Sequence, residues 1–105
     1  MAKSLQIISA QTSSSGSSTE FRINSDNQGV IREQPQLGIT SASSSNTVAY
    51  TLKWKASDGL FYTTSDVIPI IGFAMLPYIN EVIFRLDWTS NISTISAQVF
   101  GGVAS

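Results

Sequence analysis

The residues that could carry out acid–base chemistry in this chain are carboxylates, lysines and tyrosines, because its 105 residues include no cysteine and no histidine. Thiolate nucleophiles, imidazole bases and the usual zinc and copper ligands are therefore excluded. Glu81 and Asp87 have the even spacing that places both on one face of a strand, as the paired carboxyl groups of a glycosidase require. Arg85 shares that face and balances the two acids, which favours a solvated surface. We expect no catalytic residue and no enzymatic activity.

One segment has oxygen ligands of the kind that bind calcium. Asn24, Asp26 and Asn27 precede Gly29, as in the first half of an EF-hand loop. The position that would need a bidentate glutamate is Pro35. Glycine-rich phosphate loops and nucleophile elbows are also missing from the sequence. We therefore expect a turn between strands here, with no metal site and no cofactor.

Tryptophan and tyrosine side chains are the groups that could stack on sugar rings. Trp54 and Trp88 each end a row of alternating apolar residues, which predicts that both are buried in the core. Tyr62 and Tyr78 lie near the ends of apolar stretches and are candidate glycan contacts. Asn91 begins an N-glycosylation sequon. We see no secretion signal before it and interpret the sequon as a chance match.

Two stretches have the period of half-buried strands. Apolar residues alternate with polar or small ones over Val48–Lys55, and again over Val82–Thr89. The dipeptide Asp58-Gly59 favours a reverse turn, because glycine adopts positive φ without a Cβ clash. These signals predict a hairpin over residues 48–64.

Shorter apolar stretches separated by Ser, Asn, Gly and Pro predict further strands, at Leu5–Ala10, Thr19–Ile23, Val30–Glu33, Leu37–Thr40 and Ile92–Phe100. No segment has the three- and four-residue spacing of an amphipathic helix, and at most one helical turn is expected, near Leu76–Asn80. The sequence therefore predicts a single all-β domain over residues 1–105. Its architecture is an antiparallel β-sandwich or barrel of about seven or eight short strands with almost no helix.

The segment Val67–Ile79 is the longest apolar run in the chain. Successive residues of a strand point to opposite faces, so this run cannot all face the interior of a two-layer domain. Either it is an edge strand and a loop covered by its own domain, or part of it is buried against another subunit. The second reading predicts an oligomer interface formed by Val67, Ile68, Ile70, Ile71, Phe73, Met75 and Leu76.

The net charge and the length of the longest apolar run limit the kinds of partner that we expect. Six basic and seven acidic residues give a net charge of -1, and the basic residues are scattered along the sequence, so we expect no nucleic-acid binding. The apolar run is too short for a transmembrane helix and contains two prolines, so we expect no membrane partner.

The serine-rich tracts at residues 12–18 and 41–46 predict surface loops. Residues 1–18 are a candidate extended or flexible N-terminal arm.

The whole pattern from Ser4 to Ser105 resembles that of small all-β virion proteins of tailed bacteriophages, in particular the decoration or cement proteins of capsids. Such proteins are short, rich in Ser and Thr and poor in Cys and His. The resemblance implies a homotrimer that assembles through apolar segments, binds the major capsid protein or another virion protein, and stabilises the shell. It also implies assembly in the host cytoplasm and location in the virion.

Three hypotheses for function follow. The first is a non-enzymatic decoration or cement protein that associates with itself and binds a capsid lattice. The second is a glycan-binding β-sandwich module, either lectin-like or receptor-binding, that uses Tyr62 and Tyr78. The third is a subunit of a phage tail tube, baseplate or fibre.

Overall fold

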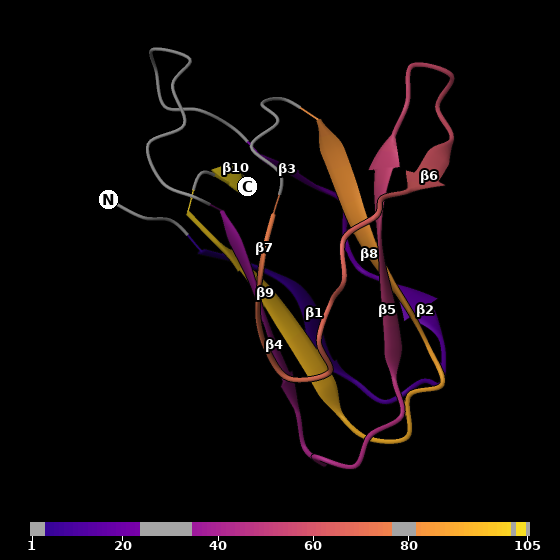
Figure 1. Ribbon diagram of the computed structural model, residues 1–105, viewed down its shortest axis with the longest axis vertical. Helices are drawn as coiled ribbons and strands as arrows, with labels where there is room; N and C mark the ends of the chain where they lie inside the picture. The colour runs from indigo at the N-terminus through magenta and orange to yellow at the C-terminus, as the bar shows by residue number, and fades with distance from the viewer. Residues whose placement is uncertain (1–3, 24–34, 77–81, 102, 105) are drawn as a thin grey trace.

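Strands provide all the regular structure in the part of the chain described by the computed structural model, namely residues 4–23, 35–76, 82–101 and 103–104. They form two antiparallel sheets that face each other as the layers of a β-sandwich (Figure 1). The predicted all-β, antiparallel architecture is confirmed. These residues include no helix long and apolar enough to cross a membrane.

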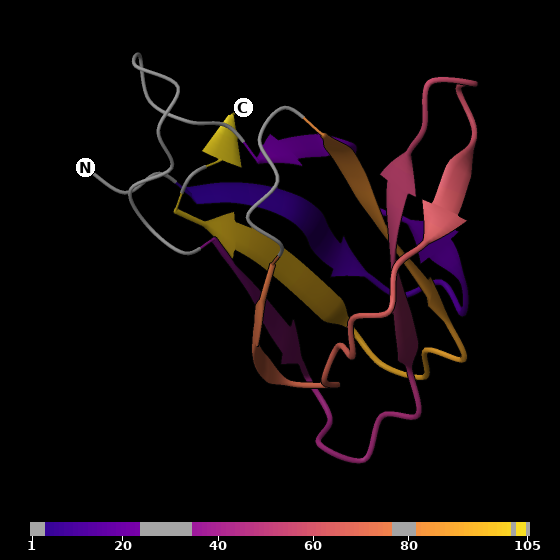
Figure 2. The same ribbon diagram turned by 45° about the horizontal axis from the view of Figure 1, so that its top comes forward.

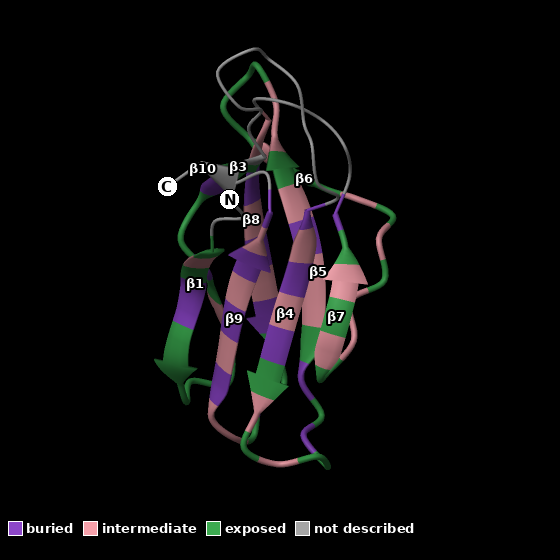
Figure 3. Cartoon of the chain, turned by 90° about the vertical axis from the view of Figure 1, so that its left-hand side faces the viewer, coloured by how far each residue is buried: buried purple, intermediate pink, exposed green. Residues whose placement is uncertain are grey.

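The first sheet has four strands in the order β1-β9-β4-β7. Its strands are β1 (Ser4–Gln11), β9 (Ile95–Phe100), β4 (Gln36–Ser41) and β7 (Gly72–Met75). Strand β7 pairs with β4 alone and therefore forms one edge of this sheet. Figure 3 views the molecule from the side of this sheet and shows burial alternating along the strands.

The second sheet has six strands, of which five run in the order β10-β3-β8-β5-β6, and β2 pairs with β8. Its strands are β2 (Gly16–Ser17), β3 (Phe21–Ile23), β5 (Ala49–Lys55), β6 (Phe61–Thr63), β8 (Ile83–Thr89) and β10 (Val103–Ala104). The N-terminal segment thus contributes β1 to one sheet and β2 to the other. The predicted strand at Val30–Glu33 and most of the predicted helical turn near Leu76–Asn80 lie outside the described residues.

The side chains of β8 alternate between the core and the outer face, as the sequence predicts, and β5 contributes to the same core. In β8, Phe84, Leu86 and Trp88 are buried and face the other sheet, while Arg85 and Asp87 lie on the outer face. Leu52 of β5 is paired with Leu86 and is equally buried. Inward residues of both sheets form one apolar cluster, which is the main stabilising feature of the domain.

The predicted burial of Trp54 is wrong, because its side chain is 39% exposed. Trp54 follows the same alternation as Leu52, and its cross-strand neighbour on β8 is Phe84. However, the β5–β6 hairpin continues past the end of the four-stranded sheet (Figures 1 and 2). The inner side of this hairpin therefore lacks an opposing layer at Trp54.

Strand β1 contains two irregularities that change which residues face inward. Gln6 is paired with Gln98, but Ile8 is paired with Ala97, so β1 has one more residue than β9 between these pairs. This bulge turns both Ile7 and Ile8 toward the core, where they are 4% and 2% exposed. A second shift follows Ile8 and contains Ala10 at a φ of 46°.

Two buried asparagines join three loops at one end of the sandwich. The Asn46 Nδ2 atom donates to Asn91 Oδ1 over 2.8 Å, and Asn46 Oδ1 accepts from the backbone N–H groups of Val48 and Ile92. Asn91 Nδ2 in turn donates to the carbonyl of Ser13. Backbone groups in a loop need such partners when they are removed from water. The pair therefore fixes the ends of β5, β8 and the N-terminal loop relative to one another.

Replacement of Asn46 by alanine is expected to lower the free energy of unfolding by about 3 kcal/mol, because the buried N–H of Val48 and the partly buried N–H of Ile92 lose their acceptor. Chemical denaturation measured by fluorescence checks this value. Thr47→Ala is the control, since it removes only one exposed hydrogen bond, to the Ser90 carbonyl. Equal effects of the two variants would contradict the role assigned to Asn46.

Tyr50 has a buried hydroxyl group with no hydrogen-bond partner among the described residues. Burial raises the pKa of this phenol to about 12. We expect Tyr50→Phe to increase the free energy of unfolding by about 1 kcal/mol, because the variant removes a polar atom that the fold leaves unsatisfied. Denaturant titration of the two proteins measures the change, and a loss of stability would show that the hydroxyl has a partner.

Candidate functional site

The most prominent candidate site is an apolar area on the outer face of the four-stranded sheet. Phe73 and Met75 of β7 point outward and are 68% and 61% exposed. Ile71 is also exposed and directly precedes this strand, and Phe100 of β9 shares a row of the sheet with Met75. We refer to Ile71, Phe73, Met75 and Phe100 as the apolar surface.

A shallow groove lies beside the two phenylalanine rings of the apolar surface. The rings of Phe73 and Phe100 are 6.1 Å apart between centroids, on either side of Gly38. A Cβ atom at Gly38 would lie 2.9 Å from Phe100 Cε2 and 3.0 Å from Phe73 Cε1. Glycine therefore allows both rings to lie low over the sheet. The adjoining groove has a volume of about 380 Å³ and is bordered by Ile71, Phe73 and Phe100.

The apolar surface lies on a sheet without charge. None of the four strands β1, β9, β4 and β7 contains an acidic or basic residue. Gln36 and Gln98 are the polar neighbours of the apolar side chains in the register of the sheet. Contact between two such faces would therefore involve no repulsion between like charges and no burial of an unpaired ion.

The seven residues predicted to form an interface divide into two groups. Ile70, Ile71, Phe73 and Met75 are exposed, and Val67 is 90% exposed. Leu76 is 2% exposed and lies in the core, and Ile68 is partly buried against that core. The segment thus supplies residues to both the interior and the surface, as the alternation of a strand requires.

The outer face of the six-stranded sheet is charged. Asp87 contacts Arg85 through two hydrogen bonds, of 2.8 and 3.1 Å, and lies 3.2 Å from the Lys53 ammonium group. The Arg85 guanidinium lies 4.2 Å from the centroid of the Phe61 ring. Partial burial acts to raise the pKa of Asp87, but hydrogen bonds from Arg85, Ser17 and Lys53 outweigh it and hold the pKa below its usual range. Glu81, the other acid expected on this face, lies outside the described residues.

The Asp87 network predicts a loss of stability in acid. The folded-state pKa of Asp87 is lowered, so its contribution is present above the ordinary value of 3.8 and disappears as the pH falls through the lower folded-state value. We expect Asp87→Asn to cost about 1 kcal/mol at neutral pH, because the pair is partly exposed to water. Thermal unfolding at a series of pH values tests this. If the difference in melting temperature between the natural protein and the Asp87→Asn variant were as large at about pH 2 as at neutral pH, the role assigned to Asp87 would be contradicted.

Of the two predicted glycan contacts, Tyr62 is described and Tyr78 lies outside the described residues. Tyr62 is 43% exposed, and its ring centroid lies 5.9 Å from that of Trp54. The Tyr62 hydroxyl donates to Asp58 Oδ2 over 2.6 Å, which lowers the pKa of Asp58 and raises that of Tyr62. The alternation along the strands does not indicate that Trp54 is a partner of Tyr62. Their similar distance from the Asp58-Gly59 turn could have indicated the pairing.

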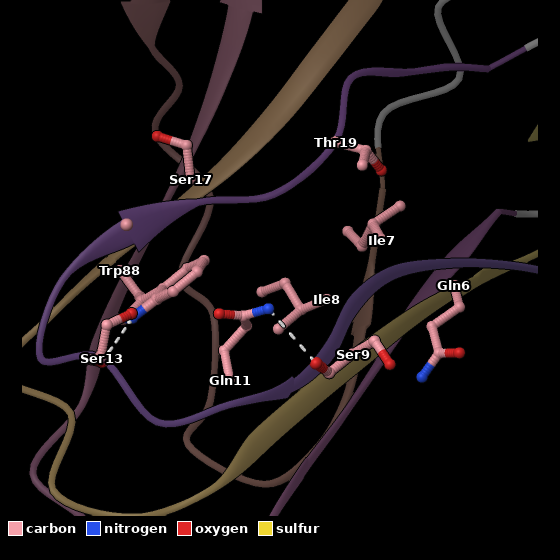
Figure 4. Close-up of a pocket in the computed structure, with 10 residues that line it drawn as sticks. Gln6, Ile7, Ile8, Ser9, Gln11, Ser13, Ser17, Thr19 and Trp88 are labelled. Carbon is pink, nitrogen blue, oxygen red and sulfur yellow. Dashed lines mark hydrogen bonds between the residues drawn. The ribbon is translucent and has the colours of Figure 1, made fainter.

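A cleft of about 390 Å³ opens between β1 and the segment that contains β2 (Figure 4). Uncharged polar side chains line it, including Gln11, Ser9 and Thr19, above Ile8 and Trp88. Trp88 is 4% exposed, and its indole N–H donates to the Ser13 carbonyl. A Cβ atom at Gly16 would lie 2.6 Å from the Trp88 ring, so the backbone covers this side of the indole. The cleft therefore offers hydroxyl and amide groups but no open aromatic face.

Two further possibilities find no support in the described residues. Asn91 is 4% exposed and its side-chain amide is fully engaged with Asn46, Ser13 and Ser93, so the sequon is inaccessible in the folded chain. No group of three or more acidic residues that could hold a metal ion occurs among the described residues. The turn expected near Asn24 lies outside them.

Comparisons of the chain with protein-family models, with curated proteins and with solved structures found no match.

Proposed function

We propose that this chain is a non-enzymatic structural protein that associates with copies of itself and binds a protein lattice as a decoration or cement protein of a virion. The observation that carries the proposal is the exposure of Phe73 and Met75 on the outer face of an uncharged sheet. Contiguous apolar areas of this kind on small soluble domains are typical of interaction sites.

The energy available from this surface is sufficient for association. Burial of ~400 Å² of apolar area contributes on the order of 10 kcal/mol before the costs of association are subtracted. The Phe73 and Phe100 rings are held against the sheet over Gly38, so less side-chain entropy is lost when they are covered.

A second copy of the chain fits this surface better than a charged partner does. The four-stranded sheet carries no charge to pair with an ionic partner, whereas the six-stranded sheet carries Lys53, Lys55 and Arg85 on its outer face. A homotrimer, in which three apolar surfaces meet near the symmetry axis, leaves the charged sheets pointing outward. These outer faces are then available to the major capsid protein or to another virion protein.

The placement in a virion rests on the resemblance of the chain to phage decoration proteins, and self-association rests on the apolar surface. The two parts are separable. A tail or fibre subunit would use the same self-contact in another part of the particle.

The test is the molar mass in solution, measured by size-exclusion chromatography with light scattering over a dilution series. We expect a closed oligomer for the natural sequence and a monomer for the double variant Phe73→Ser, Met75→Ser. Both side chains are largely exposed, so the variant keeps its fold, which circular dichroism verifies.

Ile92→Ser is the matched control. Ile92 is 66% exposed, similar to Phe73, but it lies in the loop between β8 and β9 and not in the apolar surface. The control is expected to retain the oligomer. A monomeric natural sequence at all concentrations, or dissociation by the Ile92 variant alone, would refute the proposed self-contact.

A further inference from the structure

The β5–β6 hairpin presents two aromatic side chains that the rest of the domain covers only in part. Trp54 and Tyr62 are directly opposite each other in the register of the two strands. They are 39% and 43% exposed, with a centroid separation of 5.9 Å and an angle of 39° between ring planes. The hairpin extends beyond the four-stranded sheet (Figures 1 and 2), and both rings are partly exposed to solvent.

Asp58 fixes the position of the Tyr62 ring. Its Oδ2 atom accepts the Tyr62 hydroxyl over 2.6 Å, and its Oδ1 atom accepts the Leu60 backbone N–H over 2.9 Å. The turn itself is closed by hydrogen bonds from Gly59 to Ala56 and from Ala56 to Leu60, with Gly59 at a φ of 84°. The carboxylate and the aromatic rings are therefore held in a defined arrangement before any ligand arrives.

The carboxylate retains capacity to accept more hydrogen bonds. An ionised carboxyl group has about four acceptor positions; at Asp58 the Leu60 N–H takes one on Oδ1, the Tyr62 hydroxyl takes one on Oδ2, and the N–H of Asp58 itself also donates to the carboxylate. The nearest basic residues in the hairpin, Lys53 and Lys55, alternate with Trp54 along β5 and so point to the opposite face. The open side of the hairpin thus combines an aromatic area with hydrogen-bond acceptors and no adjacent cation from these strands.

We propose that Trp54, Tyr62 and Asp58 form a binding site for the neutral hexopyranose units of a glycan chain. The C–H face of a pyranose ring packs on the aromatic rings, and its hydroxyl groups donate to the free acceptor positions of Asp58. Acidic sugars are disfavoured because the carboxylate of Asp58 repels them. The site lies on the hairpin of the six-stranded sheet, so it is independent of the proposed self-association through β7.

The competing explanation is that Trp54 and Tyr62 only stabilise the hairpin and bind no ligand. Aromatic pairs that face each other across two strands contribute to the stability of a hairpin without binding a ligand. This role predicts that variants of Trp54 or Tyr62 change unfolding but that no sugar affects either side chain. The two explanations are therefore distinguished by a signal from Trp54 in the presence of glycans.

The experiment is a titration followed by the indole N–H signals in a two-dimensional nitrogen–proton NMR spectrum. The chain contains two tryptophans, and Trp54→Phe identifies which signal belongs to each. The probes are cellohexaose, maltohexaose and chitohexaose, with oligogalacturonate as the acidic comparison. We expect at least one neutral probe to shift the Trp54 signal at up to about 10 mM, while the buried Trp88 signal stays in place.

Variants then test each part of the site. Asp58→Asn replaces one carboxylate oxygen by an amide nitrogen that cannot accept from a sugar hydroxyl. Tyr62→Phe keeps the ring but removes the hydrogen bond to Asp58 that fixes its position. Each variant is expected to weaken binding by roughly 3- to 10-fold. Phe61→Ala is the matched control. It removes the neighbouring aromatic residue of β6, which lies with Arg85 on the opposite face, and is expected to leave the affinity unchanged.

Three results would overturn the proposal. They are an unmoved Trp54 signal with all neutral probes, stronger binding of oligogalacturonate than of any neutral probe, and equal weakening by Phe61→Ala and Tyr62→Phe. Because these results concern sugar binding and not molar mass, they leave the proposed self-association untouched.

Discussion

The alternation of side chains along a strand is the constraint from which the proposed role of this protein follows. A two-layer sandwich has one interior, so each strand can bury only one of its two faces. In β7 the inward positions are filled by Gly72 and Ala74, while Phe73 and Met75 point outward. The larger side chains of this edge strand therefore lie on the surface of the described part of the domain.

The two outer faces of the sandwich differ in chemistry. The four-stranded sheet is free of charge and carries Phe73 and Phe100 over Gly38, whereas the six-stranded sheet holds Asp87 between Lys53 and Arg85. This separation allows one sheet to contact copies of the chain while the other remains solvated. The Asn46–Asn91 pair contributes by fixing the loops that join the two layers, so that both faces are presented on one rigid body.

The sequence predicts the fold class and the long strands well, because period-two alternation is a local signal. It also predicts that part of Val67–Ile79 is exposed, since this conclusion needs only the alternation and the length of the apolar run. The exposure of Trp54 could not be predicted, because alternation indicates the side of a residue but not how far the opposing sheet extends. The inward position of both Ile7 and Ile8 depends on a bulge that is defined by pairing with β9.

Long-range hydrogen bonds are the other part that the sequence does not reveal. Asn46 and Asn91 are 45 positions apart, and each occurs in a polar loop without a motif that indicates its partner. Only the pairing of β5 with β8 brings them together. The pairing of β5 with a different strand, β6, joins Trp54 to Tyr62 and creates an aromatic area, of which strand patterns alone assign Trp54 to the core.

Hydroxyl-radical footprinting at several protein concentrations tests the central claim most directly, because it reports the solvent exposure of individual side chains. Phe73 and Met75 should become protected as the concentration rises, while Leu60 and Ile92, which are similarly exposed in the isolated chain, should keep their reactivity. If the reactivity of each of the four side chains is the same at every concentration, the apolar surface is not a site of self-association.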